Sequence, residues 1–165
     1  MGFFSFIKDA GEKLLGAGEA KAATTTAKAD PTPVNLEAAN LAAATAILDY
    51  ITKMNLTADG LAVKFDAAKD EVTLYGDAAT QEDKEKILLC CGNVAGVGTV
   101  TDEMTVKEPA ETPVFYTVVK GDNLSKISKE HYGTPNQYMK IFEANKPMLG
   151  HPDKIYPGQS LRIPK

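Results

Sequence analysis

The spacing of apolar residues changes several times along the chain. At the N-terminus, in MGFFSFIKDAGEKLLG, apolar residues recur at helical spacing between Phe3 and Leu14, and charged residues occupy the opposite face. This pattern predicts an amphipathic helix over residues 1–16. Residues 17–34 are rich in Ala, Thr, Lys and Gly and contain too few large apolar residues to form a core, so we expect a flexible tether there.

A second helix is predicted where the tether ends. Asn35 can cap this helix, and the apolar positions that follow at helical spacing are Leu41, Ala44, Leu48 and Ile51. We therefore expect these four side chains to form the buried face of the helix.

The period then changes to the alternation typical of strands. Apolar and polar residues alternate on both sides of a turn at residues 68–70, which predicts a β-hairpin whose second strand ends at Gly76. Thr80 and Asp83 form a variant of the capping box at the start of another helix. Gly92 stands where a left-handed C-cap is expected.

One more alternating segment predicts a last strand, after which residues 108–114 form a proline-containing linker. Residues 35–107 thus have the order helix, strand, strand, helix, strand, which predicts an α+β sandwich with its helices on one face of a sheet. Gly76 after the second strand and the turn at Ala95–Val100 resemble the pattern of the BON domain family.

Residues 115–165 predict the order strand, helix, helix, strand. Asp122 can cap the first of these helices, which is expected to end at Tyr132-Gly133. Thr134-Pro135-Asn136-Gln137 then supplies an N-cap, a proline at the first helical position and a capping-box glutamine. The sequences YTVVKGDNLSKIS and IYPGQSLRIP at the two ends of this segment resemble the LysM family. We therefore expect an α+β protein of two small domains, a BON-like αββαβ sandwich and a LysM βααβ module.

Composition narrows the classes of partner. The chain of 165 residues has a formal net charge of −4, which does not favour a nucleic-acid partner because phosphate binding needs an excess of basic residues. No secretory signal and no apolar run of about 20 residues is present, so we expect a cytoplasmic protein without a transmembrane segment. Acidic residues predominate in residues 1–114 and basic ones in residues 115–165. These opposite charges either attract the two halves to each other across an interface or are ordinary solvated surface charges.

The sequence offers little catalytic chemistry. The two cysteines, Cys90 and Cys91, are adjacent in a predicted helix and have no metal-ligand spacing with the two histidines, so we expect buried, reduced thiols. Neither a nucleophile with an orienting base nor a nucleotide-binding motif is found. These observations predict a binding protein rather than an enzyme, with no organic cofactor, and we expect a monomer.

The LysM resemblance implies one binding site. LysM domains bind polymers that contain N-acetylglucosamine, as in peptidoglycan, in a groove between the first strand-helix loop and the loop before the last strand. The matching positions here are Gly121, Asp122, Asn123 and Leu124 on one side and Ile155 and Tyr156 on the other. The alternative is that these residues have structural roles, with Asp122 as a helix cap and with Leu124, Ile155 and Tyr156 in the core.

The chain as a whole carries a second resemblance. Its N-terminal segment, the stretch EKILLCCGNVAGV and the stretch FEANKPM resemble a family of cytoplasmic bacterial potassium-binding proteins that combine BON and LysM domains. This resemblance implies a K⁺ ion, with Rb⁺ and Cs⁺ as further candidates, held by main-chain carbonyls. The matching positions are Ile7, Lys8, Ala10, Gly92, Val94 and Val97.

Elementary chemistry is consistent with such a site. A helix leaves its last carbonyls unpaired and partly negative, and K⁺ suits neutral carbonyl oxygens, whereas hard divalent ions favour carboxylates. If so, Gly92→Val or Gly96→Val should abolish ion binding. The alternative is that both glycines are ordinary caps and that the first helix continues through Gly11, which would leave no free carbonyls there.

Three functions follow. The favoured one is a potassium sensor or buffer in which the ion holds the N-terminal helix against the BON domain. The second is a cell-envelope adaptor whose LysM domain holds peptidoglycan. The third is an interaction scaffold at the inner membrane surface that uses Phe3, Phe6 and Ile7.

Overall fold

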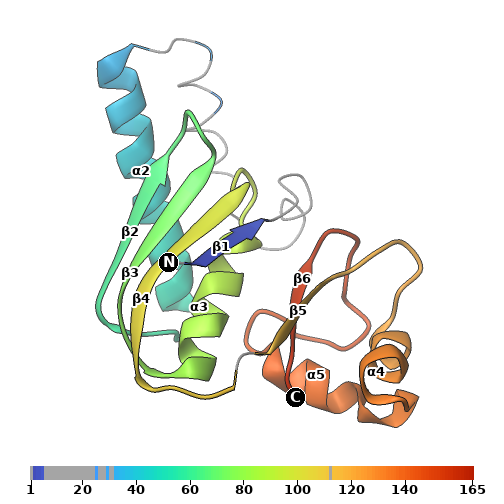
Figure 1. Cartoon of the computed structure of the whole chain (residues 1–165). Coiled ribbons are helices and arrows are strands. Elements are labelled where there is room, and N and C mark those ends of the chain that lie inside the picture. Colours follow the sequence, from blue (N-terminus) through green and yellow to red (C-terminus); the bar gives the residue numbers. More distant parts are fainter. Residues whose placement is uncertain (1, 6–24, 26–28, 30–31, 112) are drawn as a thin grey trace.

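The computed structural model describes residues 2–5, 25, 29, 32–111 and 113–165, which fold into two small α+β domains (Figure 1). The elements of the first domain are β1 (Gly2–Ser5), α2 (Pro33–Lys53), β2 (Asp59–Asp66), β3 (Glu71–Thr80), α3 (Gln81–Gly92) and β4 (Thr99–Glu108). Those of the second are β5 (Val114–Thr117), α4 (Leu124–Tyr132), the 3₁₀ turn η2 (Pro135–Gln137), α5 (Tyr138–Ala144) and β6 (Ser160–Ile163). In the described ranges, no helix has the length and apolar character that a membrane-spanning segment needs.

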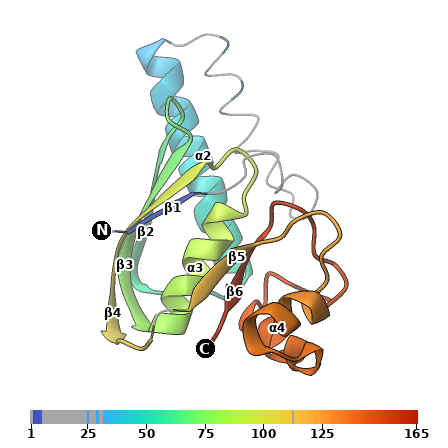
Figure 2. The ribbon, with the colours of Figure 1, turned by 45° about the vertical axis from the view of Figure 1, so that its right-hand side comes forward.

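The first domain is built on a four-stranded sheet with the order β1-β4-β3-β2. β2 and β3 form the predicted antiparallel hairpin, while β3 and β4 run parallel and α3 connects them. Helices α2 and α3 lie on the same face of this sheet, as Figure 2 shows. The predicted order of residues 35–107 is therefore confirmed, with one strand added at the edge.

That added strand corrects the prediction for the N-terminus. Gly2–Ser5 form β1, which pairs antiparallel with β4, so an amphipathic helix that includes Phe3 is wrong. Adjacent aromatic residues favour a strand, and β4 offers an open edge whose main-chain groups need partners. The rest of the predicted helix, together with most of the tether at 17–34, lies outside the described residues.

Helix α2 starts earlier than predicted, and its buried face agrees with the predicted one only in part. Thr32 is its N-cap, with the hydroxyl oxygen accepting a hydrogen bond from the Asn35 amide at 3.3 Å, and Pro33 occupies the first turn. Of the predicted stripe Leu41, Ala44, Leu48 and Ile51, Ile51 is buried, Ala44 and Leu48 are half-buried, and Leu41 is 70% exposed. The buried residues are Ala39, Ala43, Ile47, Tyr50 and Ile51. Because the segment is rich in alanine, its periodicity alone fits more than one face.

Strand β3 does not end at Gly76, as predicted, but runs through it to Thr80. Gly76 has φ +139°, and a Cβ there would lie 3.1 Å from the Cα of Leu61 on β2, where the pairing of the two strands is irregular. A glycine in mid-strand thus marks a close backbone approach rather than a strand end. The cap of α3 is as predicted, since Thr80 Oγ1 accepts from the Asp83 amide at 3.1 Å.

In the second domain, two local predictions are confirmed and one is wrong. Gly133 ends α4 with φ +74°, and Thr134 caps η2. Asn123, not Asp122, caps α4. Asp122 Oδ2 instead accepts hydrogen bonds from the Tyr116 hydroxyl at 2.8 Å and from the Val119 amide at 2.9 Å, so its side chain closes the loop that precedes the helix.

Candidate functional site

The turn between α3 and β4 carries three of the six predicted carbonyl positions. The side chains of Val94 and Val97 are buried in the core of the first domain. Between them, Gly96 has φ +93°, and the Val97 amide donates to the Val94 oxygen at 3.2 Å. Gly96 is the third of the four residues of the turn Val94–Val97, and a positive φ at that position is typical of a β-turn that requires glycine there. The path of this turn is therefore set by two buried valines and one glycine.

Hydrogen bonds around the turn show which carbonyls are used. The amides of Asn93 and Val94 donate to Leu89 and Cys91, at 3.0 and 3.1 Å. In the described part of the chain, the carbonyls of Gly92 and Val97 accept no hydrogen bond. The Val94 oxygen accepts one and has a second lone pair. Toward the described residues, each of the three predicted oxygens thus keeps at least one lone pair without a hydrogen bond.

The electrostatics of this end of α3 favour a cation. The C-terminus of a helix carries partial negative charge, and no basic residue lies in the last turn of α3. Gly92 is not the predicted left-handed cap, because it is the last helical residue and Asn93 is the C-cap with φ −87°. The glycine whose conformation the turn requires is Gly96.

The other three predicted positions, Ile7, Lys8 and Ala10, lie outside the described residues. The strand that precedes them is described, however, and its register is informative. Ser5 lies opposite Thr99 in the antiparallel pair of β1 and β4. Thr99 follows Val97 by two residues, so the register places Ser5, the end of β1, beside the start of β4 and close to the turn.

The chemistry of this site differs from that of a divalent metal site. Among the residues that the structure describes, no group of three or more His, Cys, Asp or Glu side chains could hold a metal ion. Carbonyl oxygens are neutral ligands, which suit a large monovalent cation better than a hard divalent one. The donors present at the turn thus fit K⁺ in kind.

The core of the first domain holds three buried titratable groups, Cys90, Cys91 and Tyr50, and the burial of the two cysteines is as predicted. Burial raises the pKa of the Cys90 thiol to about 12 and that of Cys91 well above its usual value. Burial likewise raises the pKa of Tyr50. The thiols are therefore neutral at physiological pH and serve as core packing.

The same turn contacts the LysM domain through Asn93, a contact that the sequence did not predict. The Asn93 side chain donates from Nδ2 to the Ser160 oxygen at 3.1 Å and accepts from the Ser160 amide at Oδ1 at 3.0 Å. Both residues are buried. β6 therefore lies beside α3, as both views of the ribbon show (Figures 1 and 2).

A buried ion pair reinforces this domain contact. Arg162 Nε donates to Glu85 Oε2 at 2.5 Å, and the other carboxylate oxygen accepts from Gln81 Nε2 at 2.6 Å. Met148 of the LysM domain also packs into the core of the first domain. The opposite charge of the two halves of the chain and the charged residue Glu85 on the apolar face of α3 are sequence signals for such a contact. The pairing itself joins residues 77 positions apart, which local patterns do not reveal.

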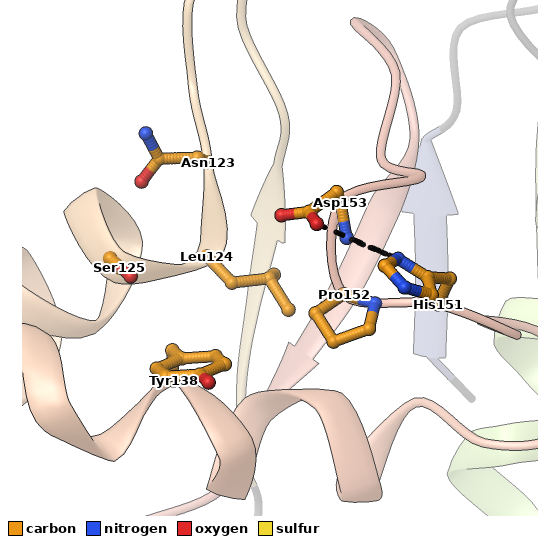
Figure 3. A pocket seen from close by; sticks show the side chains of 7 residues that line it. All are labelled: Asn123, Leu124, Ser125, Tyr138, His151, Pro152 and Asp153. Atoms are coloured by element: carbon orange, nitrogen blue, oxygen red, sulfur yellow. Dashed lines mark hydrogen bonds and ion pairs between the residues drawn. The ribbon is translucent and has the colours of Figure 1, made fainter.

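The LysM domain has a surface pocket of about 570 Å³ between the start of α4 and the loop before β6 (Figure 3). Its lining residues are Asn123, Leu124, Ser125, Tyr138, His151, Pro152 and Asp153. Figure 3 shows Leu124 and Tyr138 at its base, with the polar side chains of Asn123 and Asp153 on opposite sides. The pocket thus combines an aromatic ring with hydrogen-bonding groups.

Two of the six predicted glycan-contact residues, Asn123 and Leu124, line this pocket. Gly121 and Asp122 do not, since they form the loop before the helix cap. Ile155 packs against the LysM core, and Tyr156 lies close to Tyr50 of the first domain. The second wall comes from residues 151–153, which the sequence did not predict.

Comparison with known proteins supports both domain assignments. The BON domain model matches residues 39–108, and the LysM domain model matches residues 116–164. Over its full length the chain is 44% identical to a protein of Escherichia coli O6:H1 (strain CFT073) named "Potassium binding protein Kbp", of which 99% is covered. A further similarity, 51% identity over 49 residues, is to an uncharacterized protein of Deinococcus radiodurans, of which 19% is covered.

Proposed function

Because this chain belongs to the same family as the potassium binding protein Kbp, we propose that it binds K⁺ and acts as a potassium sensor or buffer rather than as an enzyme. The ligands in this proposal are the main-chain carbonyls of Gly92, Val94 and Val97 with those of Ile7, Lys8 and Ala10. The observation that supports it is the register of Ser5 with Thr99, which brings the end of β1, two residues before Ile7 in the sequence, beside the start of β4, two residues after Val97.

The surroundings of the turn support this ligand set. Main-chain oxygens keep their positions only if the backbone is held, and here the backbone is held on several sides. The amides of Gly98 and Thr99 donate to the Asp70 oxygen at 2.8 and 3.2 Å, and the two valine side chains are fixed in the core. Such preorganisation favours a cation whose hydration shell is weak, as K⁺ has in carbonyl-lined channels, with Rb⁺ and Cs⁺ as closest analogues.

Binding should also link the N-terminal segment to the α3–β4 turn. An ion that contacts both segments binds only the form in which they are together, so it stabilises that form by mass action. This gives the protein its sensing property, because compactness and stability then depend on potassium concentration. We place this activity in the cytoplasm, and cell fractionation checks that location.

Calorimetric titration of the full chain with KCl, matched against NaCl at constant ionic strength, tests the proposal. We expect saturable binding of K⁺ and none of Na⁺, and a melting temperature that rises with KCl. RbCl and CsCl extend the series. Equal responses to K⁺ and Na⁺ would show that the turn holds no selective ion site.

The LysM pocket favours a second candidate function, the binding of glycan that contains N-acetylglucosamine. Tyr138 offers an apolar ring on which a sugar can lie, and Asn123 and Asp153 offer hydrogen bonds. Titration with a chito-oligosaccharide, followed by amide NMR, should perturb residues 123–125 and 151–153 if this holds. Tyr138→Ala should then weaken binding, whereas Met139→Ala, an exposed neighbour outside the pocket, should not.

A further inference from the structure

We infer that Asn93 is a positioning residue that couples ion binding at the α3–β4 turn to docking of the LysM domain. This inference rests on the proposed function and adds a regulatory route to it. Asn93 stands between Gly92 and Val94, two of the proposed ligand positions, and its side chain binds the main chain of Ser160 in β6. One residue therefore belongs to both contacts.

The backbone of Asn93 is fixed by the first domain. It is the C-cap of α3, and its amide donates to the Leu89 oxygen at 3.0 Å. Its φ and ψ of −87° and 5° relate the peptide plane that carries the Gly92 carbonyl to the next plane, from which the chain continues into Val94. A change in the backbone at Asn93 thus moves the Gly92 carbonyl relative to the segment that carries the Val94 carbonyl, because the dihedral angles of Asn93 relate the two peptide planes that meet there.

The side chain of Asn93 completes the hydrogen bonding of the LysM strand. Main-chain groups on the open edge of β6 are bound by two asparagine side chains, Asn145 at Arg162 and Asn93 at Ser160. Asn145 belongs to the LysM domain itself, whereas Asn93 belongs to the other domain. Ser160 is buried, so without Asn93 its amide and carbonyl would lack partners, at a cost to the docked arrangement.

Coupling follows from this shared residue. If the ion holds the turn in the described geometry, it also holds the Asn93 side chain in position for Ser160, and the docked LysM domain does the same for the turn in return. Such linkage is reciprocal, so each event strengthens the other by the same factor. The ion site and the domain interface then respond together to potassium concentration.

The amide of Ser160 reports this coupling directly, because it donates to Asn93. We expect its hydrogen exchange in the full-length protein to be slower in KCl than in NaCl of equal ionic strength. In Asn93→Ala, this salt-specific difference should disappear, and the affinity for K⁺ measured by calorimetry should fall roughly fivefold or more. Asn136→Ala, the same chemical change at an exposed site of the LysM domain, should leave both quantities unchanged.

The outcomes separate the coupling from the proposed function. If the wild-type protein does not bind K⁺, both are wrong. If it binds K⁺ but Ser160 exchanges equally in the two salts, the coupling is wrong and the function stands, and this comparison needs no variant. A purely structural role for Asn93 would accelerate exchange equally in both salts and leave the K⁺ affinity unchanged, which would also overturn the inference.

Discussion

Glu85 of α3 and Arg162 of β6 form a buried ion pair that joins the two domains, with Nε and Oε2 2.5 Å apart. Glu85 is only 1% exposed, so its charge depends on Arg162 and on the Gln81 amide for compensation. Removal of one partner from such a pair leaves an uncompensated charge in the protein interior.

Arg162→Met should therefore lower the free energy of unfolding by about 3 kcal/mol or more. Replacement of both partners, in Glu85→Leu with Arg162→Met, should cost much less, because no charge then remains buried. Urea unfolding of the wild type, the two single variants and the double variant measures this. Additive effects of the two substitutions would contradict the interdomain ion pair.

Gly96→Ala should weaken K⁺ binding because φ +93° at this position is unfavourable for any residue with a Cβ. The strain is relieved by a change in the turn that carries the Val94 and Val97 carbonyls, so we expect a clear loss of affinity in calorimetry. Gly133→Ala is a matched control, since this glycine also has positive φ, +74°, but lies in the LysM domain with open space around it. It should lower stability without changing K⁺ affinity.

Gly76→Ala should destabilise the first domain more than Gly60→Ala. Both glycines have positive φ, but a Cβ at Gly76 would meet the Leu61 backbone at 3.1 Å, whereas nothing lies within 4 Å of one at Gly60. We expect about 1 kcal/mol for Gly60→Ala from conformation alone and at least about 2 kcal/mol for Gly76→Ala. Equal melting temperatures of the two variants would exclude the close approach of β2 and β3.

The buried cysteines predict a loss of stability at alkaline pH. The pKa of Cys90 is raised to about 12 in the folded protein, while an unfolded thiol ionises near its ordinary pKa of 9.0. The folded state therefore retains protons that the unfolded state releases, so stability is fully present below pH 9 and declines between about pH 9 and 12.

Thiol reactivity checks the same point. At pH 8, a thiol-specific reagent should react slowly with the folded protein and rapidly in denaturant, since the thiolate is the nucleophile. A Cys90→Ala, Cys91→Ala variant should lose part of the alkaline destabilisation. Rapid labelling of the folded wild type would show that these thiols are accessible.

Features encoded by neighbouring residues were predictable from the sequence. The Thr80 cap of α3, the hairpin turn before Glu71, the left-handed end of α4 at Gly133 and the Thr134–Pro135 helix start each depend on residues within a few positions of one another. Their conformational preferences act over the same short distance, so the domain types and the order of elements followed from them.

The features that only the tertiary structure determined depend on contacts between residues far apart in the chain. The N-terminal residues form a strand because β4 offers an open edge, and α2 buries the Ala39–Ile47 face because of what packs against it, not because of its alanine-rich period. The same holds for Asn93, the C-cap of α3, which becomes a domain contact only because β6 presents Ser160 to it. Contacts of this kind arise when distant segments bury a common surface, and no local preference specifies them.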